Sequence, residues 1–116
     1  MKQKPGIWLA RSLNNASKAA TSVNAAATAL SQPVICVVGP TASGKTDVAQ
    51  VIAQRINGEV VSADSMQVYR GMDIGTGKLP VSERLVSHHG FDLVDPGEPF
   101  SAALFQAYAR QSFVEI

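Results

Sequence analysis

The segment that most constrains this chain is GPTASGKT, residues 39–46, which lies between an apolar run and a helix-like pattern. It matches G-x-x-x-x-G-K-[ST] at every fixed position, the pattern of a loop that binds phosphate. Gly39 and Gly44 allow the backbone torsions that turn successive N–H groups inward, toward an anion. The segment therefore predicts a strand, a phosphate-binding loop and a helix, in that order.

The residues on both sides of the loop fit this order. Residues 34–38 form a continuous apolar run, typical of a strand buried on both faces, and we expect Cys36 within it to be a small buried side chain. A second strand is expected over residues 59–63, and strand, helix, strand with short joints is a βαβ unit with parallel strands. Between the two strands, four apolar residues at helical spacing predict a buried helix face: Val48, Val51, Ile52 and Ile56.

The rest of the chain predicts one more strand and one more helix. Residues 70–90 look irregular, residues 91–95 read as a third strand, and Ser101 is expected to cap a helix that runs to Ile116. The predicted fold class is α/β, a parallel sheet with flanking helices like that of the P-loop NTPases. We expect it to be incomplete, because only half of a doubly wound sheet can be traced. The face of the last helix is expected to consist of Leu104, Phe105, Tyr108, Ser112 and Phe113.

The first 32 residues differ from the rest in composition. Sixteen of the 22 residues from 11 to 32 are Ala, Ser, Thr or Asn, and no helical or strand period is sustained there. We predict residues 1–32 to be a disordered leader and residues 33–116 to be the folded part. Residues 1–31 carry four basic and no acidic side chains, whereas residues 32–116 carry six basic and nine acidic ones, so the folded part lacks the basic face typical of nucleic-acid binding.

No apolar run approaches the roughly 20 residues that a membrane-spanning helix needs, so we expect no membrane contact. The single cysteine rules out an internal disulfide and favours a reducing compartment. We therefore expect a cytoplasmic protein. The acid-free leader leaves organelle targeting as the alternative.

Two residues of the loop and one beyond it carry the expected chemistry. Lys45 places a positive charge on the outer phosphates, and the Thr46 hydroxyl is the expected ligand of Mg²⁺. Asp64 follows the second strand, and the carboxyl ends of parallel strands meet at one edge of a sheet. A carboxylate there can accept a proton or help to hold the metal. The alternative is that Asp64 caps a turn through Ser65.

Beyond the loop, two longer stretches carry a family resemblance. VVSADSMQVYRGMDIGT, residues 60–76, and HHGFDLVDPGEPFSAALFQ, residues 88–106, resemble the amino-terminal portion of the tRNA dimethylallyltransferases, also called tRNA isopentenyltransferases. The resemblance implies transfer of a dimethylallyl group from dimethylallyl diphosphate to N6 of the adenosine on the 3′ side of the anticodon, with Mg²⁺ assisting. It makes residues 33–116 the amino-terminal part of a P-loop prenyltransferase domain, in a monomeric tRNA-modifying enzyme.

The resemblance also assigns residues to roles. Asp64, Ser65, Met66 and Gln67 would contact the target adenosine of the tRNA anticodon stem-loop, and Asp64 would be the catalytic base that accepts the N6 proton. Reaching N6 requires the adenine to leave its stack. The diphosphate would lie on a loop that is also commonly labelled an ATP site: Gly39, Pro40, Thr41, Ala42, Ser43, Gly44, Lys45 and Thr46.

The sequence also departs from the family. The family usually has His-His-Leu-Ile-Asp where this chain has a glycine, Gly90, in third place, and the segment around Lys78 departs from Thr-Ala-Lys-Pro. The family's later Gly-Gly-Thr-Gly segment, diphosphate-binding arginines and tRNA-binding insertion do not occur, so we expect a truncated form that is inactive alone. Two alternatives stay open: a P-loop kinase for a small molecule or nucleoside, and a phosphate-binding fragment without catalysis. The DSMQVYRGMDIG stretch favours the transferase.

Overall fold

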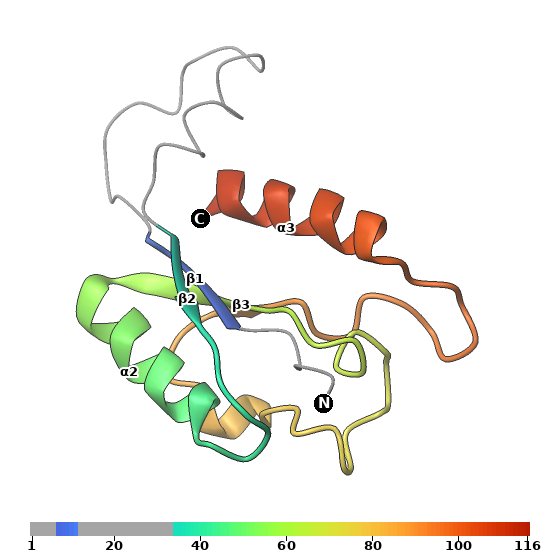
Figure 1. Ribbon diagram of the computed structural model, residues 1–116, viewed down its shortest axis with the longest axis horizontal. Coiled ribbons are helices and arrows are strands. Elements are labelled where there is room, and N and C mark those ends of the chain that lie inside the picture. Colours follow the sequence, from blue (N-terminus) through green and yellow to red (C-terminus); the bar gives the residue numbers. More distant parts are fainter. Residues whose placement is uncertain (1–6, 12–33) are drawn as a thin grey trace.

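The computed structural model describes residues 7–11 and 34–116. The sheet has the strand order β2-β1-β3-β4, with α2 on one side and α3 on the other (Figure 1). This arrangement confirms the α/β class. In chain order the elements are β1 (Ile7–Arg11), β2 (Val34–Val37), α2 (Lys45–Ile56), β3 (Gly58–Ser62), the 3-10 turn η1 (Val81–Glu83), β4 (His88–His89) and α3 (Ala102–Glu115).

One inner strand of the sheet comes from the predicted leader. β1 pairs antiparallel with both β2 and β3, so these two strands run parallel to each other with β1 between them. β3 and β4 pair in parallel, and the expected parallel arrangement therefore holds for every strand except β1. The prediction of disorder is wrong for residues 7–11, because their Ile-Trp-Leu run has high strand propensity and supplies backbone partners to both neighbours. The rest of the predicted leader lies outside the described residues.

β2 is an edge strand, and it is more exposed than the sequence predicted. Val34 and Ile35 are each 37% exposed, and Cys36 is exposed as well. The prediction of a strand buried on both faces is therefore wrong, and so is that of a buried cysteine. The physical reason is that, within the described part of the chain, β2 has a neighbouring strand on one side only.

α2 faces the sheet with its alanines. Ala49 and Ala53 are fully buried and pack against Val60 of β3, and the two isoleucines of the predicted face are partly buried. Val48 and Val51 remain 51% and 42% exposed, so for them the predicted burial is wrong. The small alanine side chains bring the helix close to the sheet, and the two valines lie on a flank of the helix that the narrow sheet does not cover.

The third strand is shorter and earlier than predicted. β4 consists of His88 and His89 alone. Gly90 then takes φ +89°, Asp92 takes φ +55°, and Val94 makes only an isolated bridge to Tyr69. The predicted strand over residues 91–95 is therefore wrong, because two left-handed residues interrupt the extended backbone.

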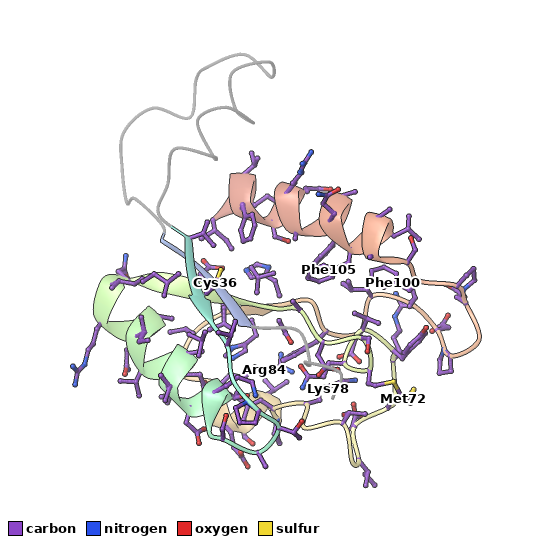
Figure 2. All side chains as sticks on the ribbon, in the orientation of Figure 1. Cys36, Met72, Lys78, Arg84, Phe100 and Phe105 are labelled. Carbon is purple, nitrogen blue, oxygen red and sulfur yellow. The ribbon has the colours of Figure 1, made fainter. Side chains whose placement is uncertain are left out.

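α3 begins where the sequence predicted. The Leu104 N–H donates to the Ser101 hydroxyl at 3.2 Å, which confirms the expected cap. Ala109 and Ser112 are buried on the sheet side, and Phe105 lies on that side in Figure 2. Leu104, expected on the same face, is 52% exposed because it lies beside the buried stripe, which begins at Phe105 in the same turn. Among the described residues, no helix has the length and apolar character needed to cross a membrane.

Candidate functional site

The loop between β2 and α2 contains two residues with left-handed backbone torsions, a feature of anion-binding nests. Ala42 and Gly44 both take left-handed torsions, with φ of +61° and +77°. Alternation of such residues with right-handed ones turns consecutive N–H groups toward a common centre. For alanine this conformation costs roughly 1–2 kcal/mol, and strain of this kind is typical of ligand-binding loops.

The loop side chains are ordered around the carbonyl of Pro40. Lys45 Nζ donates to that oxygen at 2.5 Å, and the Ser43 hydroxyl donates to it at 2.8 Å. A Cβ atom at Gly39 would lie 3.2 Å from Ser43 Oγ, a tight contact, and 3.7 Å from Lys45 Cδ, an ordinary one, so glycine leaves room for the serine hydroxyl. The ammonium is thus held over the loop, and Thr46 lies in the first turn of α2 behind it.

The loop and Asp64 lie at the same edge of the sheet. Val37, at the end of β2, and Ser62, at the end of β3, both pair with Ile7 of β1. The two strand ends are therefore level, and two strand spacings place them about 9–10 Å apart. Gly39 comes two residues after Val37, and Asp64 comes two residues after Ser62. The arrangement puts a carboxylate across this edge from the phosphate-type loop.

Asp64 caps the turn that follows β3. Its Oδ1 accepts hydrogen bonds from the N–H groups of Met66 at 2.8 Å and Gln67 at 3.3 Å, which leaves Oδ2 outside these two bonds. The turn-capping alternative is therefore realised, and it is compatible with proton acceptance at the second oxygen. Of the other predicted contact residues, Ser65 and Met66 are exposed, whereas Gln67 is buried.

A buried lysine, which the sequence did not single out, closes the loop after this turn. Lys78 Nζ donates to Asp92 Oδ1 at 2.7 Å, to Asp73 Oδ1 at 2.9 Å and to the Tyr69 carbonyl at 2.9 Å, and the side chain is only 4% exposed. Burial disfavours the charged ammonium, but the two carboxylates more than offset this and raise the pKa of Lys78. Figure 2 shows Lys78 on the inner side of its loop. No local pattern signals this role, because one partner is 14 residues away.

His88 is held as a neutral side chain on β4. Its Nδ1 lies 2.8 Å from the Val86 carbonyl, which can only accept, so Nδ1 carries the proton. The other nitrogen, Nε2, is buried without a hydrogen-bond partner among the described residues. Burial lowers the pKa of His88, and the charges of Arg84 and His89 act in the same direction.

This environment predicts acid sensitivity. Because the pKa of folded His88 lies below its ordinary value of 6.5, the unfolded chain takes up the proton first as the pH falls. We expect the free energy of unfolding to be highest above about pH 6.5 and to fall below it, by at most about 1.4 kcal/mol per pH unit for one proton. Urea titrations from pH 7.5 to 5 measure this slope. His88→Asn, which keeps a donor for Val86, should flatten it; an unchanged slope in this variant contradicts the assignment.

Comparisons with known proteins agree with this arrangement. A model of the protein family described as IPP transferase matches residues 67–116. The chain is 50% identical over 91 residues to the tRNA dimethylallyltransferase of Moorella thermoacetica, covering 73% of this chain and 28% of that protein. It is 62% identical over 81 residues to the tRNA dimethylallyltransferase of Heliobacterium modesticaldum, covering 69% of this chain and 25% of that protein.

Two solved structures share the fold. The tRNA isopentenylpyrophosphate transferase of Staphylococcus epidermidis aligns with a TM-score of 0.66 at 46% identity, covering 68% of this chain and 26% of that one. The full-length transferase of the same name from Bacillus halodurans aligns with a TM-score of 0.63 at 54% identity, covering 67% and 26%. The chain thus spans about a quarter of the length of these relatives. Over the matched residues, both the sequence and the fold of this chain are similar to those of the tRNA dimethylallyltransferase family.

Proposed function

We propose that this chain is part of a tRNA dimethylallyltransferase, and that its loop holds the diphosphate of dimethylallyl diphosphate while Asp64 faces the acceptor adenosine. The observation that carries the proposal is the pairing of Val37 and Ser62 with the same residue of β1, which sets loop and carboxylate level at one edge. The segments that follow β2 and β3 resemble this family, and this resemblance supports the same assignment.

The chemistry divides between the two sides of that edge. The N6 amine of the adenosine attacks C1 of the dimethylallyl group, the bond from C1 to the diphosphate oxygen breaks, and the diphosphate leaves with the electron pair. The inward N–H groups of the loop and the Lys45 ammonium stabilise the negative charge that grows on the leaving group. The N6 proton passes to the Asp64 carboxylate, at the oxygen outside the turn.

Mg²⁺ would fit this site as an ion held largely by the diphosphate of the prenyl donor. The described residues contain no group of three or more His, Cys, Asp or Glu side chains that could hold a metal. A single hydroxyl ligand from Thr46, completed by diphosphate oxygens and water, is an ordinary magnesium arrangement. When bound, the ion would supply additional neutralisation of the diphosphate.

Donor binding tests the proposal, because the loop is the part of this chain to which the proposal assigns the diphosphate. Calorimetric titration of the 116-residue chain with dimethylallyl diphosphate and MgCl2 should show saturable binding. Lys45→Met should weaken it about 10- to 100-fold, the scale of one lost charge-assisted contact. Arg55→Met is the matched control, since it removes a cation from the exposed last turn of the same helix and should leave the affinity within about twofold.

ATP provides the competing outcome. A P-loop kinase would bind ATP in preference to the prenyl donor and would pass its γ-phosphoryl group to an acceptor. Absence of donor binding together with phosphoryl transfer from ATP would refute the transferase assignment.

A further inference from the structure

The side chain of Gln67 is directed into the protein, although the family resemblance assigns this residue to contact with the substrate. Gln67 is only 9% exposed. Its Oε1 accepts a hydrogen bond from the Ser62 hydroxyl at 2.7 Å, and its Nε2 donates to the Thr76 carbonyl at 3.1 Å. Both ends of the amide are therefore engaged inside the protein.

The orientation of this amide is fixed by chemistry. The Thr76 carbonyl can only accept a hydrogen bond, so the nitrogen of Gln67 must face it and the oxygen must face Ser62. A flipped amide would set two acceptors against each other. Ser62, the last residue of β3, is itself only 3% exposed, so the Ser62 end of the network is shielded from water.

The backbone of Gln67 joins two further segments. Its N–H donates to Asp64 Oδ1 at 3.3 Å, and its carbonyl accepts from the Asp92 N–H at 3.2 Å. The loop that it reaches is closed in turn, because the Thr76 hydroxyl donates to the Met72 carbonyl at 2.7 Å. Gln67 thus links the end of β3, the turn of Asp64, the loop to Thr76 and the segment after β4.

We propose that Gln67 is a positioning residue, which fixes the turn that carries Asp64 from inside and does not touch the acceptor adenosine through its amide. The inference deepens the proposed function, on which the role of Asp64 rests. Because the side chain of Gln67 is directed inward, the residues of the turn that a substrate can contact are the exposed ones, Ser65 and Met66. The internal hydrogen bonds of Gln67 carry the argument, and they can be tested with no substrate present.

Amide hydrogen exchange of the ligand-free chain is the test. Gln67→Glu is nearly isosteric and places a carboxylate oxygen against the Thr76 carbonyl, and Ser62→Ala removes the other partner. In both variants we expect the Met66 N–H, which is bonded to Asp64, to exchange at least about tenfold faster, the scale of one lost buried hydrogen bond. Val60 and Val61 of β3 should keep their rates. Gln54→Glu, at an exposed position of α2, is the matched control and should change neither.

The outcomes separate the two proposals. Unchanged exchange at Met66, or an equal acceleration throughout β3, would overturn the positioning role, because the side chain would then be dispensable or merely part of the core. Calorimetric titration with dimethylallyl diphosphate addresses the proposed function separately. Failure of the unaltered chain to bind the prenyl donor counts against that function, whereas the exchange result needs no ligand.

Discussion

Gly90→Ala should strongly destabilise this chain. A Cβ atom at Gly90 would lie 2.3 Å from the carbonyl oxygen of Ser62, a contact that backbone atoms cannot relieve without moving β3. The substitution also places alanine at φ +89°, outside the conformations that it readily adopts. Together, overpacking and backbone strain should lower the free energy of unfolding by about 3–4 kcal/mol.

The consequences reach the candidate site, because Ser62 holds the amide of Gln67 and the Gly90 N–H donates to the Tyr108 hydroxyl at 3.0 Å. Urea denaturation followed by circular dichroism measures the loss. Gly71→Ala is the matched control, since Gly71 takes φ +72° but has no atom within 4 Å of the added carbon. It should cost only about 1–2 kcal/mol, the strain of a left-handed alanine. If the two variants lost the same free energy of unfolding, the close contact with the Ser62 carbonyl would add nothing to the backbone strain, and this account would be contradicted.

Removing both carboxylates around Lys78 should destabilise the chain more than removing the lysine. Asp73→Asn with Asp92→Asn leaves an ammonium whose side chain is 4% exposed without a counterion, and we expect a loss of about 3 kcal/mol. Lys78→Met leaves two carboxylates whose side chains are 67% and 46% exposed and stay hydrated, so it should cost about 1 kcal/mol.

The order of these losses, measured by urea denaturation at pH 7, is the critical result. Adding Lys78→Met to the double asparagine variant should recover stability, because it removes the uncompensated charge. A lysine variant as unstable as the double variant would contradict this account. Because the pKa of Lys78 is raised, its contribution is complete at neutral pH and is lost only as strongly alkaline solution deprotonates the ammonium.

Local signals predicted the parts of the fold that depend on neighbouring residues. The loop pattern fixed the start of α2, and Ser101 fixed the start of α3, because each signal and its hydrogen bonds lie within a few residues. The edge shared by the loop and Asp64 also followed, since parallel strands must end on the same side.

Features that depend on distant partners were missed. The exposure of Cys36 and Val48 follows from the position of β2 at the sheet edge, which no local pattern reports. The burial of Lys78 needs Asp92, and the internal bonds of Gln67 need Thr76, nine residues along. Gly90 was visible as a departure from the family pattern, yet only the approach of the Ser62 carbonyl shows why a side chain is excluded there.

The register of β1 has a consequence for the proposed function. β1 is hydrogen bonded along both edges, so the offset between its two neighbours depends on which residues it aligns. A slip of two residues against one neighbour alone would keep every side chain on its original face, yet would displace the loop relative to Asp64 by roughly 7 Å along the strands. Under the proposed function, the separation between the loop that holds the diphosphate and Asp64 is therefore determined by the backbone pairing of residues 7–11.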